Sequence, residues 1–293
     1  MTLELSSSTD KRVFLLCNMP DSLKGAISKA WQQHYEELYE PEAESAASLQ
    51  DALDEILELF QGSNQTLSHL RYVWMALILA SVVEPTVEYY QPNNSIPEET
   101  ISRIAVWLIE NLGKILDSKI PITQLSREED ANAIVDAFLL FSENKQIASF
   151  QVLSEALNVY SSAIKALDYN HSLEALLYIL DDCLEGYAIF PGSYGRRELF
   201  DWWLLEVVPA SWYLFPPSSI YSINQLQNDN NIALRQMNKL KKISSAMWST
   251  ILTNNQSQES SRLQTFHRPF YSSTKIELDV KLEKTSLTLE YKV

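Results

Sequence analysis

Apolar residues recur every three or four positions along most of the chain, from residue 21 to residue 253. This spacing puts them on one face of an α-helix, so the pattern predicts a mainly helical protein. Prolines, glycines and capping residues interrupt the pattern and mark the helix ends. The expected helices cover 21–40, 46–60, 66–83, a segment opened by Pro97, a segment capped by Ser126, 146–167, 171–185, 196–208 and 229–253. Most connections are short, which favours antiparallel neighbours.

The longest apolar run covers 72–83 and is broken only by Ser81. A helix that crosses a bilayer needs about 20 apolar residues, so this run is too short to span one. We expect it to form a buried central helix that ends before Pro85.

An alternation of apolar and polar residues replaces the helical pattern near the C-terminus. The segments 275–283 and 287–293 both alternate, and 284–286 separates them, which predicts a β-hairpin. A lone hairpin is marginal in water, so a further strand or a helix must cover its apolar face. The N-terminal segments 3–5 and 13–17 supply candidate strands.

These elements predict a fold of eight to ten antiparallel helices with a small C-terminal β-hairpin. Helix pairs recur at roughly 45–50 residues but share no consensus, so the helices form either an irregular bundle or a superhelical array of HEAT-like architecture. We divide the chain into an N-terminal extension with room for a short strand (1–20), a helical domain (21–253), and a linker plus a hairpin packed on that domain (254–293).

The charge of the chain is uneven. Residues 1–190 carry 29 acidic and 11 basic residues, a net charge of −18, whereas residues 191–293 carry 9 acidic and 12 basic residues, a net charge of +3. The acidic part would repel nucleic acid, and it suits either a basic partner or the chain's own basic part. The helix expected over 229–253 carries Arg235, Lys239 and Lys242 opposite its apolar stripe, and we expect it to cover the acidic part.

The cysteines and the N-terminus indicate a cytosolic protein. Cys17 and Cys183 lie far apart and form no metal-binding or redox spacing, which is typical of a reduced compartment. The apolar run 13–17 is too short for the core of a signal peptide.

The most unusual chemistry begins with Asp181, Asp182 and Glu185 at the expected end of a helix. Their spacing places them on neighbouring faces, and clustered carboxylates of this kind hold Mg²⁺. This DDxxE pattern resembles the aspartate-rich motif of class I terpenoid synthases, which are all-helical and of similar size. The resemblance implies a Mg²⁺-dependent enzyme that acts on a diphosphate.

The second metal motif of that family, NDxxSxxxE, is incomplete in this chain. It would start at Asn228, but Ile232 and Gln236 stand where the family has Ser and Glu. We therefore expect no Mg²⁺ site, no other metal and no cofactor. The favoured interpretation pairs the three carboxylates with Arg196 and Arg197, because a nearby cation offsets their unfavourable position at a helix C-terminus.

The turn between the carboxylates and these arginines is rich in glycine, with Gly192 and Gly195 flanking Ser193 and Tyr194. Glycine backbone N–H groups can approach a phosphate, but the spacing of a nucleotide-binding loop is missing. The alternative is a tight turn that needs a positive φ angle at a glycine.

Three tryptophans follow in the same region: Trp202, Trp203 and Trp212. The helix around the first two is apolar on nearly every side, which is typical of a central core or a subunit interface. We expect core packing, and we keep a small apolar ligand among these rings as an alternative.

Taken together, these patterns favour a non-enzymatic, protein-binding scaffold or adaptor with an acidic helical surface and a basic protein partner. The alternatives are a Mg²⁺-dependent diphosphate enzyme and a module for an apolar ligand. The candidate binding residues are Asp181, Asp182, Glu185, Arg196, Arg197, Trp202, Trp203 and Trp212.

Overall fold

A computed structural model describes residues 19–39, 47–61, 65–116, 147–189, 195–222 and 230–264. These ranges are mainly helical, as predicted, and no strand occurs within them. The predicted hairpin over 275–293, the candidate N-terminal strands and the helix expected after Ser126 lie outside them. Contacts divide the chain into Met1–Asn255, which is described next, and Gln256–Val293.

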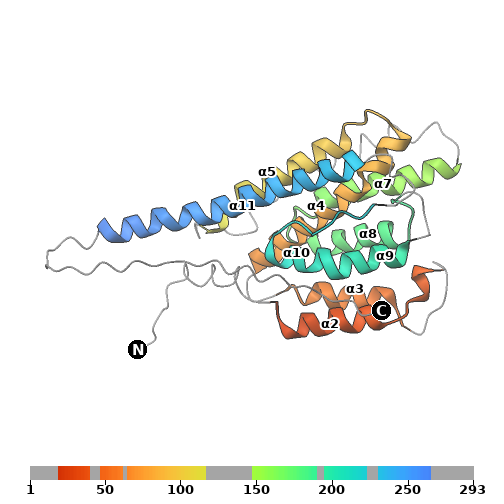
Figure 1. Cartoon of the computed structure of the whole chain (residues 1–293), viewed down its shortest axis with the longest axis horizontal. Helices are drawn as coiled ribbons and strands as arrows, with labels where there is room; N and C mark the ends of the chain where they lie inside the picture. Colours follow the sequence, from red (N-terminus) through yellow and green to blue (C-terminus); the bar gives the residue numbers. More distant parts are fainter. Residues whose placement is uncertain are drawn as a thin grey trace. The chain divides into compact units, whose positions relative to one another are not determined.

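The helical elements are shown in Figure 1. They are α2 (Asp21–Gln32), η1 (Glu36–Leu38), α3 (Leu49–Glu58), α4 (Gln65–Tyr90), α5 (Ile96–Leu116), α7 (Ile147–Lys165), α8 (Ser172–Leu184), α9 (Arg196–Trp202), the π-helical segment η4 (Trp203–Val207), α10 (Val208–Tyr213) and α11 (Asn230–Gln264). Helix α11 continues well beyond its expected end at 253, through residues expected to form a linker.

Helix α4 is the centre of the domain. It packs against α5, α7, α8 and α10, and its middle turns are buried on every side (Figure 1). By length and composition it is the one described helix that could cross a bilayer, yet 94% of its most apolar stretch is buried inside the protein. This burial confirms the expectation of a buried central helix.

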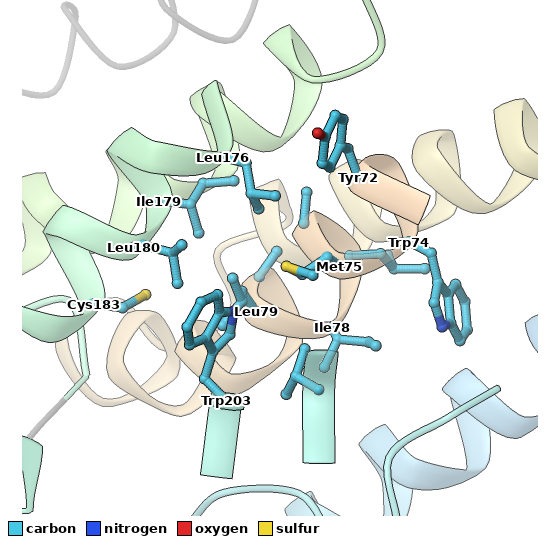
Figure 2. Close-up of a cluster of buried hydrophobic side chains, with 14 of the residues drawn as sticks. Tyr72, Trp74, Met75, Ile78, Leu79, Leu176, Ile179, Leu180, Cys183 and Trp203 are labelled. Carbon is cyan, nitrogen blue, oxygen red and sulfur yellow. The ribbon is translucent and has the colours of Figure 1, made fainter. Parts of the chain in front are cut away.

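The core between α4 and α8 is built from aliphatic side chains that interdigitate. Met75 and Leu79 of α4 face Ile179 and Leu180 of α8, and Trp203 closes the cluster from a third direction (Figure 2). All five side chains are essentially inaccessible to water. Burial of these apolar side chains stabilises the packing of α4 on α8.

The prediction that the central helix ends before Pro85 was wrong, because α4 runs through this residue to Tyr90. Proline has no backbone N–H, so the carbonyl of Ser81, four residues earlier, lacks its normal helical donor. The side-chain amide of Gln236, from α11, donates to that carbonyl instead. A contact distant in sequence thus replaces the missing bond and allows the helix to continue.

The first predicted helix, 21–40, also ends early. Helix α2 stops at Gln32, and η1 follows after an extended residue. The guanidinium of Arg197 donates to the backbone carbonyls of Trp31 and Gln33, at 2.6 and 2.9 Å. This side chain therefore satisfies carbonyl groups that the end of α2 leaves open.

Candidate functional site

Five carboxylates from three elements form an acidic cluster at the C-terminal end of α8. Asp181, Asp182 and Glu185 come from this helix end, Glu155 from α7 and Glu37 from η1. Asp181 is exposed, whereas the other four are half-buried. The sequence indicated three of these residues, but α7 and η1 are too distant in the chain for it to indicate the other two.

Burial and like charge raise the pKa values within this acidic cluster. Burial raises the pKa of Asp182 to about 7, with smaller contributions from the negative charges of Asp181 and Glu155. Burial also raises the pKa of Asp181. The pKa of Glu185 is raised by burial and by Asp181 and Glu37, and only Arg196 acts in the opposite direction. Among the described residues, the positive charge of Arg196 thus offsets only part of this effect, and it does so at Glu185.

Glu155 ties the cluster to the turn after α8. One of its oxygens accepts a hydrogen bond from the backbone N–H of Tyr187, and the other accepts one from Gln151 at 3.1 Å. Gly186 directly precedes Tyr187 in this turn. A Cβ atom at Gly186 would lie 2.7 Å from the backbone oxygen of Asp182 and 2.8 Å from a carboxylate oxygen of Glu155. The glycine therefore allows the chain to turn tightly against the carboxylate.

The structure corrects the predicted pairing of the α8 carboxylates with the two arginines. Arg197 forms its ion pair with Asp201, one helical turn away, at 3.0 Å, in addition to its two bonds to α2. Arg196 donates to the backbone carbonyl of Gly186 at 3.4 Å, and its guanidinium carbon lies 5.5 Å from the centre of the Tyr187 ring. Neither arginine forms an ion pair with Asp181, Asp182 or Glu185, all of which are described residues.

Arg196 is nevertheless the cation whose charge acts on Glu185. It is 3% exposed, and its Nε and Nη1 atoms have no hydrogen-bond partner among the described residues. Its charge lowers the pKa of Glu185, but less than burial and the neighbouring acids raise it. The arginine therefore reduces the repulsion in the acidic cluster without neutralising it.

The acidic cluster does not have the arrangement of a metal site. Within the described ranges, no group of three or more His, Cys, Asp or Glu side chains is arranged to hold a metal ion. Asn228, where the incomplete second motif begins, lies outside those ranges, whereas Gln236 is buried against α4.

The glycine-rich turn ends at Gly195, which has a φ angle of +116°. This value confirms the prediction of a positive φ angle at a glycine. The hydroxyl of Tyr221 donates to the carbonyl of Gly195 at 3.0 Å and fills the space a Cβ would need, 2.6 Å from its ideal position. The rest of the turn, 192–194, lies outside the described residues.

The three candidate tryptophans are part of the core. Trp203 is fully buried against Phe200, and Trp202 donates its ring N–H to the carbonyl of Ser219 at 3.0 Å. The ring of Trp212 lies 3.4 Å beneath the guanidinium carbon of Arg71. Burial of these rings confirms the preference for core packing over an interface.

Arg235 and Lys239 of α11 form ion pairs with acids of α4, which agrees with the expectation that the basic face of this helix covers the acidic part. The sequence did not indicate Glu84 as their partner. Glu84 of α4 is 7% exposed and pairs with Arg235 at 3.1 Å and with Lys239 at 3.7 Å. An acid next to Pro85, inside an otherwise apolar stretch, is the signal that points to this contact.

Comparisons with protein-family models, with curated proteins and with solved structures give no match to this chain.

Proposed function

We propose that the protein is a non-enzymatic binding scaffold and that its acidic cluster binds a basic segment of a partner protein. The observation that carries the proposal is the absence of compensating charge. No described Lys or Arg side chain forms an ion pair with Glu37, Glu155, Asp181, Asp182 or Glu185. A partner's cations would supply that charge.

Exposed aromatic side chains beside the cluster support a basic protein partner. Tyr187 is 39% exposed and lies directly after the turn held by Glu155. Tyr178 of α8 is 52% exposed and lies one helical turn before Asp181. Aromatic faces next to carboxylates suit arginine, which forms ion pairs and also stacks on rings.

The two alternative functions have weaker support. A diphosphate enzyme needs carboxylates arranged around a metal ion, and the described residues contain no such group. A site for an apolar ligand among the tryptophans needs free ring surface, and the rings of Trp203 and Trp212 are covered by Phe200 and Arg71. The irregular-bundle or superhelical arrangement, the C-terminal hairpin and the cytosolic location are part of the same proposal.

The test uses a fluorescent arginine-rich peptide and the full chain, with binding measured by anisotropy at low and high salt. Replacing Asp181, Asp182 and Glu185 by Asn, Asn and Gln should weaken binding about tenfold, because three partly exposed ion pairs are lost. Added salt should weaken wild-type binding more than binding by this variant.

The matched control, compared at pH 8 where Asp182 is mostly ionised, neutralises three exposed acids of α5 and so changes the net charge by a similar amount: Glu98→Gln, Glu99→Gln and Glu110→Gln. This control should bind the peptide almost as the wild type does. Equal losses in both variants would show a response to net charge alone and would contradict the proposed site.

A further inference from the structure

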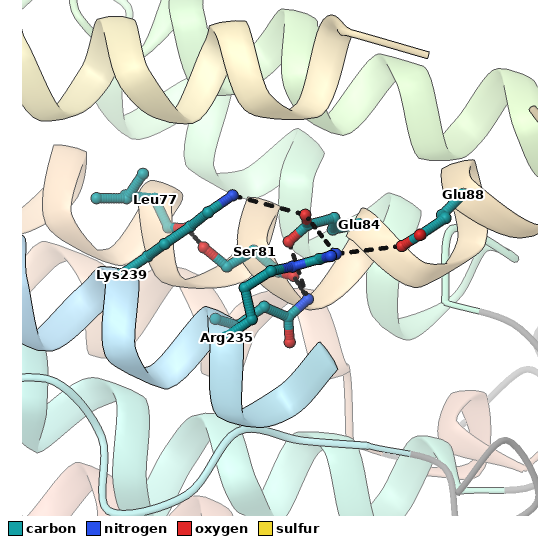
Figure 3. Close-up of polar contacts among 7 residues, drawn as sticks. Leu77, Ser81, Glu84, Glu88, Arg235 and Lys239 are labelled. Atoms are coloured by element: carbon teal, nitrogen blue, oxygen red, sulfur yellow. Dashed lines mark hydrogen bonds and ion pairs between the residues drawn. The ribbon is translucent and has the colours of Figure 1, made fainter. Parts of the chain in front are cut away.

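The α4 turn at Pro85 has polar groups that find no partner within α4 itself and that α11 satisfies in the folded chain. The carbonyl of Ser81 lacks a helical donor because of Pro85, and Gln236 supplies one. The hydroxyl of Ser81 donates to the carbonyl of Leu77 at 2.8 Å, within α4 (Figure 3). Helix α4 therefore presents a specific acceptor to its neighbour.

Glu84 makes the same turn a site for a basic helix. It receives Arg235 at 3.1 Å, Gln236 at 3.3 Å and Lys239 at 3.7 Å, all from α11 (Figure 3). Arg235 also bridges to Glu88 at 3.2 Å. We call these five residues the Glu84 network. Their spacing places Arg235 and Lys239 one helical turn apart on α11.

Helix α11 also has an apolar stripe that is buried in the common core. Met237, Leu240, Met247 and Ile251 form the buried stripe of α11. Methionine side chains repack readily and are common where a surface accepts different partners. Helix α11 also contacts the chain that follows α10: the Ser244 hydroxyl donates to the carbonyl of Leu214 at 2.9 Å, and Trp248 stacks on Phe215.

The contact of α11 thus differs from the contact between α4 and α8, which is built from aliphatic side chains. Water can replace each polar partner in the Glu84 network when α11 leaves, so undocking leaves no buried group without a hydrogen bond. Helices α4, α5, α7 and α8 also pack on one another without α11. The α11 contact combines this polar network with a short apolar stripe, and contacts within a chain that allow relative motion are typically more polar than obligate interfaces.

We propose that α11 is a displaceable helix and that the α4 surface beneath it receives an amphipathic helix of a partner protein. The partner helix carries a basic residue and an amide at the positions of Arg235 and Gln236, with a second basic residue one turn later. This proposal uses none of the residues of the acidic cluster, so either proposal can fail alone.

Hydrogen exchange of the full chain, read by mass spectrometry, gives the first test. The α11 amides should exchange at least about tenfold faster than those of α4 and α8, because local opening precedes global unfolding. Gln236→Ala should accelerate exchange in α11 about fivefold more and leave α4 and α8 unchanged. Asn238→Ala is the matched control, because its side chain is exposed beside Lys242.

A second variant isolates the hydrogen bond from the Gln236 side chain to the Ser81 carbonyl. In a Pro85→Ala background, a backbone N–H becomes available to the Ser81 carbonyl, so Gln236→Ala should accelerate exchange in α11 less than it does in the wild type.

A fluorescent peptide of residues 230–255 should bind the Gln236→Ala chain, and the same peptide with Arg235→Glu and Lys239→Glu should not.

Two results would overturn the proposal. One is exchange of α11 at the same rate as α4 and α8 in the wild type, which would make α11 a permanent part of the core. The other is a failure of the 230–255 peptide to bind the Gln236→Ala chain, which would show that the α4 surface does not accept a helix from outside.

Discussion

Single residues decide where this chain turns and where its functional groups lie. Gly195 allows a backbone angle that other residues rarely adopt, and Arg197 fixes the end of α2 by binding its carbonyls. Pro85 creates an acceptor that Gln236 fills. Each of these roles follows from the absence or presence of one chemical group: a Cβ, a guanidinium or an N–H.

Replacing Gly195 by alanine should destabilise the protein by about 1–2 kcal/mol, because the left-handed backbone angle disfavours a side chain. Crowding against the Tyr221 hydroxyl adds to this cost. Gly25→Ala is the opposite case: it lies inside α2, and nothing lies within 4 Å of the added Cβ. That change should stabilise the protein by about 0.5–1 kcal/mol. Chemical denaturation of both variants gives the comparison, and a stabilised Gly195→Ala chain would contradict the described turn.

Trp203→Ala should lower the free energy of unfolding by about 3–5 kcal/mol, because it removes a fully buried ring and leaves a cavity. Trp31→Ala, at a residue that is 49% exposed, should change it by less than about 1 kcal/mol. Thermal melting and sedimentation should be measured on both. A folded Trp203→Ala chain that only loses an oligomeric state would assign this ring to an interface.

At the scale of elements, α8 combines two contrasting parts. One of its faces is apolar and lies in the core, and its C-terminal end carries clustered acidic residues. Its Leu176, Ile179 and Leu180 are fully buried, while Asp181 is exposed. The core face holds α8 in place and so keeps Asp182 half-buried near Asp181 and Glu155. Burial is the main penalty on a charged Asp182, and the two neighbouring carboxylates add to this strain.

This strain predicts a pH dependence of stability. The pKa of Asp182 is raised from 3.8 to about 7 in the folded chain, so the folded state binds this proton more tightly than the unfolded state does. The contribution of Asp182 to stability should fall as the pH rises from about 4 to about 7 and stay constant above that. Relative to the wild type, Asp182→Asn should be more stable at pH 8, by on the order of 1 kcal/mol after allowance for solvent screening.

Denaturation curves of wild type and Asp182→Asn between pH 4 and pH 8 test this dependence. The difference between the two chains isolates Asp182 from other titrating groups. Wild type gaining stability relative to the variant as the pH rises would show that Asp182 is paired with a cation, contrary to the described cluster.

At the scale of the whole molecule, the sequence predicts local features well and long-range pairing poorly. Helical periodicity identified the buried helix α4 and the three carboxylates at the end of α8. It failed where a distant group replaces a local one, as Gln236 does for Pro85. It also paired Arg197 with the wrong carboxylates, because the position of α2 beside this arginine is set by packing and not by sequence distance.

The same distinction applies to the function. The acidic character of the chain is visible in its composition, but the gathering of Glu37 and Glu155 beside Asp182 depends on how η1 and α7 pack near α8. That no described Lys or Arg forms an ion pair with these acids also depends on the fold. For this reason the acidic cluster, and not the net charge, is the central claim.

The affinity of the arginine-rich peptide at pH 5.5 and at pH 8 tests that claim most directly, with wild type and Asp182→Asn measured side by side. Because the pKa of Asp182 is about 7, the wild-type site gains negative charge between these values, and its affinity should rise. The rise should be clearly smaller in Asp182→Asn, which keeps only the other carboxylates. Equal pH dependence in the two chains, or no binding by the wild type at pH 8, would contradict the assignment of this cluster as the binding site.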